Sequence, residues 1–244
     1  MRGGLHSGVL DRLGREIAAG TRPPGSVLTL AGLESELGVS RTVVREAVRV
    51  LEAVGMVESR QRVGVRVRPE EEWSALDPQV VGWRLAGPGR YRQLVALTEL
   101  RLAIEPTAAR LAARHADGAT RERLAALAAR LRALGEEGRG QTAPYLEADV
   151  AYHALLLEAS GNALLAALTG PVAEVLSGRS GLGLMPASPV PGALDDHEAT
   201  ARAVAAGDED AAERHARAVV EEVWREVLRA AGAPGAGAPG TGAP

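Results

Sequence analysis

Histidine and aspartate residues in the second half of the chain have the types and spacing of a metal site. Asp149 and His153 are four residues apart in EADVAYHALLLEAS, so one helix would present both side chains on the same face. His197 and His215 follow in two later segments, with apolar neighbours at helical spacing. Three imidazoles and one carboxylate suit divalent zinc, nickel, manganese or iron. Any one of these histidines could equally be an ordinary core or surface residue, and spacing alone does not bring the four together.

A second group of candidate residues is a row of arginines near the N-terminus. Arg41, Arg45 and Arg49 are spaced by four residues in RTVVREAVRVLEAVG, so they follow one face of a predicted helix, with Thr42 beside them. A guanidinium can hold O6 and N7 of guanine in a bidentate pair, or it can bind phosphate. The row could also be no more than a solvated helix face. The predicted elements around it are needed to choose between these two interpretations.

The elements around this helix favour a nucleic-acid-binding fold. Ser40 is a suitable N-cap, and GVS predicts a tight turn after a short helix over 30–38. The following MVESRQRVGVRV predicts two short strands joined by a basic turn that contains Arg60, Arg62 and Gly64. Together with a helix over residues 7–19, the order of elements is that of a winged helix-turn-helix. The hairpin would be the wing, which could reach the DNA backbone or the minor groove.

Composition limits the remaining possibilities. Of 244 residues, 46% are apolar and only 2% aromatic, with no Phe, so a core of Leu, Val and Ala in helices is expected. The absence of Cys excludes disulfides, thiol catalysis, cysteine zinc fingers and iron–sulfur clusters. All 28 basic residues are Arg, so an arginine alone indicates little. No long apolar run occurs, so we expect a cytoplasmic protein with no signal peptide and no membrane contact.

Charge divides the chain. The net charge is −3, but residues 1–69 carry 11 Arg and 7 acidic residues, whereas residues 70–244 carry 17 and 24. Opposite signs predict two domains with different partners. We expect a winged helix-turn-helix domain over 1–69, a linker over 70–78 with prolines near both ends, and an all-helical domain over 79–231. The Gly/Pro/Ala segment 232–244 is expected to be a disordered tail. The predicted fold is therefore mainly α.

The helical domain is predicted from periodicity. Its longest helix places Leu94, Leu97, Leu100, Ile104 and Leu111 on one face. Residues 178–193 are expected to form a loop. The predicted helices lie near 78–86, 91–116, 120–135, 143–159, 162–177, 194–206 and 208–231.

The N-terminal motifs resemble a known family. GVSRTVVREAVRVLEAVGMVESRQRVGVRV, preceded by IAAGTRPPGSVL, closely resembles the DNA-binding domain of GntR-type bacterial transcription regulators over about residues 5–68. The resemblance implies that the arginine row reads guanines or holds phosphates, and that Arg60, Arg62 and Gly64 form the wing. The sequence departs from the family at Ala31, where a polar residue is usual, and at Arg62, where glycine is frequent. These departures put individual base contacts in doubt but not the mode of binding.

The C-terminal motifs resemble the ligand-binding domain of the FadR-like subfamily, called FCD. The resemblance rests on DVAYH, on SGN at 160–162, on HEATARAVAAGD, and on Arg101-Leu-Ala-Ile-Glu105-Pro. It implies an all-helical bundle in which Asp149, His153, His197 and His215 hold a divalent metal such as Zn, Ni or Mn. Arg101 would receive the carboxylate of an effector, although an ion pair with Glu105 explains it equally well. Asn162 could contact the effector or cap a helix, and Arg179 is a weaker candidate.

These resemblances predict a transcription regulator rather than an enzyme. A homodimer would place two recognition helices on a pseudo-palindromic operator in double-stranded DNA. The effector would be a small organic acid, and LDPQVVGWRLAG resembles family members linked to sugar acids. Repression relieved by the effector is the commoner family behaviour, so we expect a repressor. Two alternatives stay open. One is a regulator that responds to metal alone. The other is a metal-dependent enzyme fused to a DNA-binding domain, although no HExxH or GxSxG motif accompanies the ligands.

Overall fold

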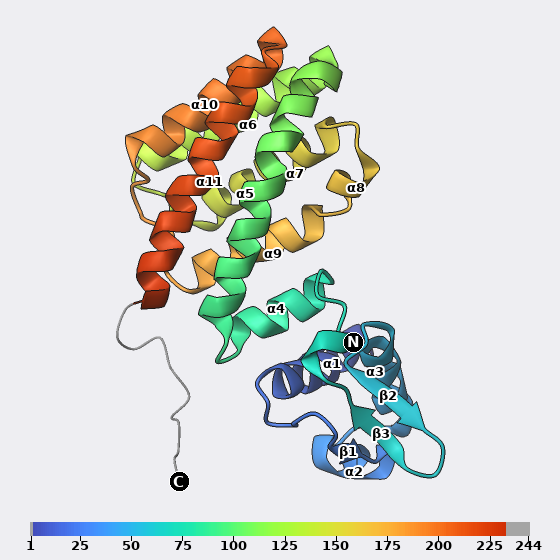
Figure 1. Ribbon diagram of the computed structural model, residues 1–244. Coiled ribbons are helices and arrows are strands. Elements are labelled where there is room, and N and C mark those ends of the chain that lie inside the picture. The colour runs from blue at the N-terminus through green and yellow to red at the C-terminus, as the bar shows by residue number, and fades with distance from the viewer. Residues whose placement is uncertain (1, 233–244) are drawn as a thin grey trace. The chain divides into compact units, whose positions relative to one another are not determined.

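The chain is described by a computed structural model that covers residues 2–232, with side chains from residue 8 onward (Figure 1). Contacts divide it into two compact units, one ending at Arg90 and the other beginning at Tyr91. Each unit is described on its own. Within the described residues, no helix is long and apolar enough to cross a membrane.

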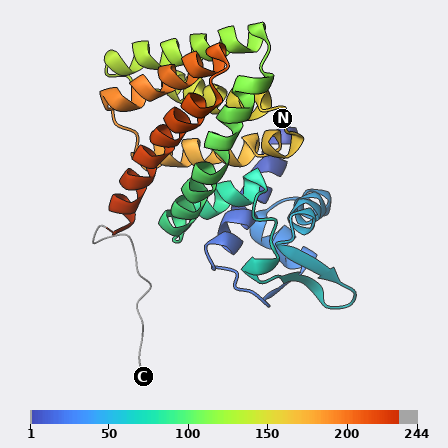
Figure 2. The same ribbon diagram turned by 45° about the horizontal axis from the view of Figure 1, so that its top comes forward.

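The N-terminal unit is a small helical domain with a three-stranded sheet (Figures 1 and 2). The sheet has the order β1-β3-β2 with both pairings antiparallel, and Val57 lies opposite Val67. The helices and the hairpin match the predicted winged helix-turn-helix. The two-residue strand β1 was not predicted, because so short a strand carries no alternating pattern. Its elements are α1 (Arg2–Ala18), β1 (Val27–Leu28), α2 (Leu30–Leu37), α3 (Arg41–Ala53), β2 (Val57–Arg60), β3 (Gly64–Val67), η1 (Glu70–Glu72) and α4 (Pro78–Ala86).

Local signals fix the helix pair α2–α3. The Thr29 hydroxyl accepts the N–H of Gly32 at the start of α2, and Gly38 ends that helix with a φ of 65°. Only a residue that tolerates this left-handed conformation allows so tight a turn, which explains the glycine. Ser40 occupies the N-cap of α3, although its side chain makes no capping bond. The apolar face of α3 is buried through Val44, Ala47, Val48 and Leu51.

Residues 70–78 differ from the predicted linker. They contain the short helix η1 and Trp73, which is buried in the same core as the strands and donates its indole N–H to the carbonyl of Arg68. Trp83 of α4 packs against Gly14 of α1 and donates to Asp11 at 2.8 Å. Trp73 therefore attaches residues 70–78 to the N-terminal unit, and Trp83 attaches α4 to it, because burying large aromatic side chains stabilises a small domain.

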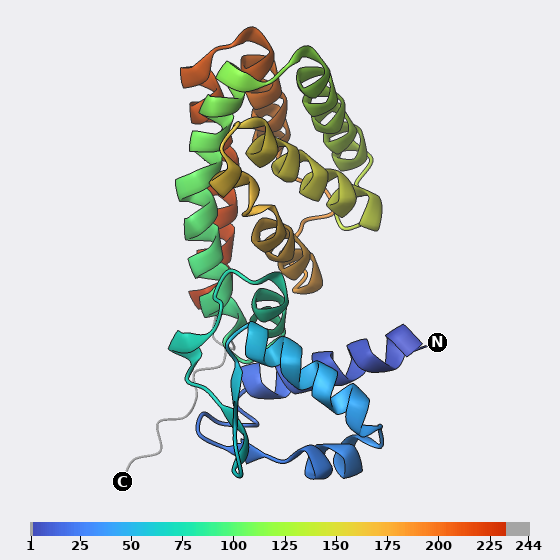
Figure 3. The ribbon, with the colours of Figure 1, turned by 90° about the vertical axis from the view of Figure 1, so that its right-hand side faces the viewer.

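The C-terminal unit consists of packed helices (Figures 1 and 3). Helix α10 packs against α11 and α6, and α7 packs against α6 and α9. The mainly helical fold is as predicted, with two changes. First, α8 and α9 replace the single helix expected over 162–177. Second, α9 extends to Gly181, so the expected loop is shorter. The helices are α5 (Arg90–His115), α6 (Gly118–Glu136), α7 (Ala143–Ala159), α8 (Ala163–Ala166), α9 (Thr169–Gly181), α10 (Pro191–Ala206) and α11 (Glu209–Gly232).

The core of this unit is built from Ala, Leu and Val, as the composition predicted. The buried face of α5 is an exception, because it includes Arg101 and Glu105, each 1% exposed. The leucine face expected on this helix is only partly buried at Leu100, Ile104 and Leu111. A helix that buries charge at its centre must supply partners for it, so this face is more than packing. The expected disordered tail lies outside the described residues, apart from Gly232.

Candidate nucleic-acid interface and candidate metal centre

The arginine row of α3 lies on the exposed face of the helix, opposite its apolar side. The side chains of Arg41 and Arg49 are 69% and 75% exposed. Arg41 lies 3.8 Å from Glu34, and Arg49 lies 3.3 Å from Glu46. Arg45 is also exposed and has no ion pair within the described part of the chain. Because exposed ion pairs contribute little, all three guanidiniums are available to a polyanion, and Thr42 is exposed beside them.

The β2–β3 hairpin presents further cations. Arg60 is half exposed and lies 2.8 Å from Glu58, while Arg62 is exposed at the turn. Arg62 has a φ of 64°, in the left-handed region that residues other than Gly and Asn seldom adopt. Gly64 has a structural role as well, because a Cβ there would lie 2.6 Å from the carbonyl oxygen of Leu28. The glycine thus allows β1 to lie against the hairpin.

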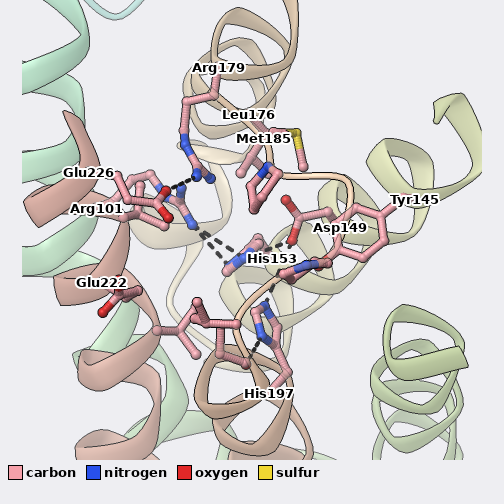
Figure 4. A pocket seen from close by; sticks show the side chains of 16 residues that line it. Arg101, Tyr145, Asp149, His153, Leu176, Arg179, Met185, His197, Glu222 and Glu226 are labelled. Carbon is pink, nitrogen blue, oxygen red and sulfur yellow. Dashed lines mark hydrogen bonds and ion pairs between the residues drawn. The ribbon is translucent and has the colours of Figure 1, made fainter. Parts of the chain in front are cut away.

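Three of the four predicted metal ligands come together in the C-terminal unit. Asp149 and His153 of α7 and His197 of α10 each offer a ligand atom, and these atoms all lie within 4.8 Å of one another (Figure 4). An Asp149 carboxylate oxygen lies 3.4 Å from Nε2 of His153 and 3.8 Å from Nε2 of His197. All three side chains are buried. We call these residues the triad.

Hydrogen bonds orient both imidazoles toward Asp149. Nδ1 of His153 lies 2.8 Å from a Glu105 carboxylate oxygen, and Nδ1 of His197 lies 2.6 Å from the carbonyl oxygen of Ala193. In the neutral form of each ring, these contacts make Nδ1 the donor and leave Nε2 as an acceptor. Nε2 of His197 is buried with no hydrogen-bond partner among the described residues. Acceptor nitrogens fixed from behind in this way are typical of histidines that bind metal.

Arg101 of α5 contacts both Glu105 and the triad residue His153. Its Nε lies 2.5 Å from Glu105, and its Nη2 lies 3.2 Å from Nε2 of His153. Its Nη1 is buried with no partner among the described residues. The sequence left open whether Arg101 pairs with Glu105 or receives an effector. The structure shows the ion pair and, in addition, a free N–H at a pocket that Arg101 lines.

The electrostatics of the cluster keep its carboxylates ionised. Burial alone would raise the pKa of Glu105, but Arg101 and His153 outweigh it and lower that pKa to about 2. The pKa of Asp149 is likewise lowered, against burial, by His153, His197 and Arg101. Burial and the charge of His153 lower the pKa of His197, which favours its neutral, metal-binding form. Burial would lower the pKa of His153, but Glu105 and Asp149 outweigh it and raise that pKa, so without a metal this ring favours its charged form. A divalent metal requires ionised carboxylate and neutral imidazole, so metal binding would displace a proton from His153.

His215 is placed differently from the sequence prediction, and Asn162 takes the second of its two predicted roles. Nδ1 of His215 lies 2.7 Å from a carboxylate oxygen of Asp196, and its side chain is 39% exposed, so it does not join the triad. Helical spacing indicated which face His215 occupies but not which neighbour faces it. Asn162 is exposed and accepts the N–H of Leu164 as the N-cap of α8, so it caps a helix and does not line the pocket.

The triad and Arg101 line one pocket with about 530 Å³ of empty space, part of it open to solvent (Figure 4). Its other polar residues include Arg179 of α9 and Glu226 of α11, which form an ion pair of 2.9 Å. The Nε of Arg179 is buried without a partner in the described chain. The sequence ranked Arg179 as a weaker candidate, named Glu105 only as the ion-pair partner of Arg101, and did not indicate Glu226. The contact between Glu105 and His153 was not predicted, because it joins two different helices.

Comparisons with known proteins agree with both units. Residues 5–67 match bacterial regulatory proteins of the gntR family, and residues 96–222 match the FCD domain. The chain is 31% identical to the galactonate operon transcriptional repressor of Escherichia coli over 223 residues, which cover 90% of this chain and 95% of that protein. It is also 31% identical to a probable D-xylose utilization operon transcriptional repressor of Paenarthrobacter nicotinovorans, with 85% and 81% covered.

Solved structures show the same fold. E. coli McbR/YncC is 17% identical, with a TM-score of 0.54 and 93% of this chain and 98% of that chain covered. Lar, described as controlling the expression of the Listeria monocytogenes agr system, is 17% identical, with a TM-score of 0.56 and coverage of 92% and 96%. The two matched regions, the overall identity to operon repressors and the shared fold agree with the predicted resemblance. The chain belongs to the GntR family of bacterial transcription regulators, with a C-terminal FCD domain.

Proposed function

We propose that this regulator represses transcription by binding a pseudo-palindromic operator as a homodimer, and that a small carboxylate together with a divalent metal controls this binding. The observation that carries the proposal is one pocket that contains two buried, unpartnered groups of complementary use. Nε2 of His197 can coordinate a metal, and Nη1 of Arg101 can donate a hydrogen bond to an anion. The family consists of regulators that bind DNA and small molecules, which agrees with a sensor rather than an enzyme.

The DNA contacts are assigned to the exposed arginines of the N-terminal unit. Arg41, Arg45 and Arg49, with Thr42, would face base edges and phosphates from α3, as the recognition helix of a helix-turn-helix does. Arg60 and Arg62 would bind the backbone or minor groove from the hairpin. Since guanidinium contacts release counterions from DNA, operator affinity should fall steeply with salt.

The metal site is assigned to the triad alone. Asp149, His153 and His197 supply one carboxylate and two imidazoles, a set that suits zinc, nickel or manganese. When bound, the metal would supply a Lewis-acidic position for a carboxylate oxygen. Glu105 would keep His153 in the required tautomer, and Arg101 would hold the same effector carboxylate through its free N–H.

The effector class follows from these groups and from the relatives. A pocket with a cationic donor and a metal position suits a small organic acid. The relative named as a galactonate operon repressor makes sugar acids the first class to test. For the acid to act as a switch, it must bind the DNA-free and DNA-bound states with different affinities.

The test uses the full-length protein and a DNA duplex that the protein itself selects from a random pool. Operator binding is measured with the metal-free and the zinc-loaded protein, with and without a panel of sugar acids. We expect at least one acid to weaken binding of the zinc-loaded wild type and to have no effect on His153→Ala. His215→Ala is the matched control and should retain both metal and response.

Three outcomes would contradict parts of the proposal. A change in operator affinity with zinc alone, and with no acid, would indicate a regulator that responds to metal only. Loss of bound zinc in His215→Ala, measured by metal analysis, would overturn the three-residue assignment. Chemical conversion of the acid by the purified protein would favour the enzyme alternative.

A further inference from the structure

The pocket of the C-terminal unit has a second polar region beside the triad, formed by Arg179 and Glu226. Nη2 of Arg179 lies 2.9 Å from a carboxylate oxygen of Glu226. Arg179 is 6% exposed and the Glu226 side chain is 24% exposed, so the pair is largely shielded from water. In Figure 4 this pair lies on the far side of Arg101 from His153. A ligand held at the triad and Arg101 would extend toward it.

The two regions of the pocket favour ligand groups of different charge. At the triad, a divalent metal and the free N–H of Arg101 both favour a carboxylate. At the second region, the positive charge of Arg179 is already balanced by Glu226. A second ligand carboxylate there would lie beside the Glu226 carboxylate in a partly buried site, where like charges repel strongly. The second region therefore disfavours a second negative charge.

The same region can bind a neutral polar group. Nε of Arg179 is buried without a partner among the described residues, so it offers one N–H. A hydroxyl can accept from that N–H and donate to a carboxylate oxygen of Glu226, which satisfies both groups. Leu176, Met185 and Val223 also line the pocket and suit the C–H groups of a short carbon chain.

We propose that Arg179 and Glu226 determine effector specificity, and that they select a hydroxylated monocarboxylate and reject the dicarboxylate of the same carbon skeleton. This inference rests on the proposed function, since it assumes that one carboxylate binds at Arg101 and the metal. It adds the chemistry of the other end of the ligand, which is uncharged and carries hydroxyl groups.

The experiment uses acid pairs that differ only at the far carbon. Galactonate and galactarate form one pair, and gluconate and glucarate form another. Hexanoate and adipate form a pair without hydroxyls. Binding to the zinc-loaded full-length protein is measured by calorimetry. We expect at least one hydroxylated monoacid to bind about tenfold or more tightly than its diacid, and more tightly than hexanoate.

Two variants on α11 test the cause. Glu226→Gln removes the carboxylate that pairs with Arg179 and keeps the size of the side chain, while Glu222, which also lines the pocket and pairs with Arg225, stays in place. The preference for the monoacid should fall to about threefold or less, chiefly through tighter diacid binding. Glu221→Gln is the matched control, because Glu221 lies on the same helix and does not line the pocket. It should keep the wild-type preference.

The possible failures can be separated. If no acid of any pair binds, both the proposed function and this inference fail. If a diacid binds as tightly as its monoacid, the proposed function stands and the inference is overturned. An unchanged preference in Glu226→Gln would also overturn it, provided that circular dichroism and zinc content show the variant to be folded and loaded. Tighter binding of hexanoate than of every hydroxylated acid would overturn the assignment of hydroxyl recognition.

Discussion

Arginine is used in opposite ways in the two units. On α3, the side chains of Arg41 and Arg49 are more than two-thirds exposed and their acidic neighbours are exposed or partly exposed as well. On α5, Arg101 is 1% exposed, bonded to a carboxylate that is equally buried, and in contact with His153. An exposed guanidinium costs little to leave unpaired, so it remains free for a phosphate or a base. A buried one must be compensated, and the position of its remaining N–H is then fixed.

The comparison teaches that residue type alone does not distinguish a nucleic-acid contact from a ligand contact in this chain. Every basic residue is Arg, so the surroundings decide its use. Exposure and row spacing favour binding to an extended polyanion. Burial, fixed partners on neighbouring helices and an unsatisfied N–H favour recognition of one small anion.

The largest effect is expected from breaking the buried pair. Glu105→Ala leaves the Arg101 charge buried with no carboxylate in contact and should destabilise the C-terminal unit by about 3–5 kcal/mol. Urea unfolding of the full-length protein measures the change. Glu16→Ala in the N-terminal unit is the matched control, because Glu16 pairs with Arg12 and Arg22 near the surface, and the loss there should be below about 1 kcal/mol. Equal losses would erase the contrast between the units.

An intermediate effect is expected from the exposed row. Arg45→Ala should weaken binding to the selected operator by about 10- to 100-fold, because one good base or phosphate contact contributes about 1–3 kcal/mol. The salt dependence of binding should become shallower, while zinc content and acid binding stay at wild-type values. Arg15→Ala is the control, since Arg15 is exposed on α1 and pairs only with Asp11 among the described residues. Wild-type operator affinity in Arg45→Ala would remove α3 from the interface.

The smallest effect concerns the stability of the N-terminal unit at low pH. Burial would raise the pKa of Glu16, but its bonds to Arg12 and Arg22 lower it below the ordinary value of 4.5. A lowered folded-state pKa gives stability that is present above about pH 4.5 and is lost as pH falls below it. The difference in melting temperature between wild type and Glu16→Gln should therefore be a few degrees at most at pH 7 and should shrink toward pH 3. A difference that grows at low pH would contradict the assigned pair.

Much of the fold could be predicted because its signals are local. The turn at Gly38, the apolar face of α3 and the hairpin around Gly64 depend on residues close together in sequence. The segment 70–78 could not be assigned in the same way, because proline and acidic residues suggest a linker while the burial of Trp73 depends on a core formed by distant residues. The break between α8 and α9 was not predicted, although Gly170 and Pro171, which follow it directly, are a local signal for a helix boundary.

The sequence by itself determined the kinds of chemistry available: arginine for anions, His and Asp for a metal, and no thiol. Helical spacing placed Asp149 and His153 together, because residues four apart share a face. Only the tertiary structure decided that His197 joins them and that His215 pairs with Asp196 instead. It also decided that Glu105 orients His153. The reason is that convergence of side chains from α5, α7 and α10 depends on how the helices pack, and packing is set by the whole core rather than by any local spacing.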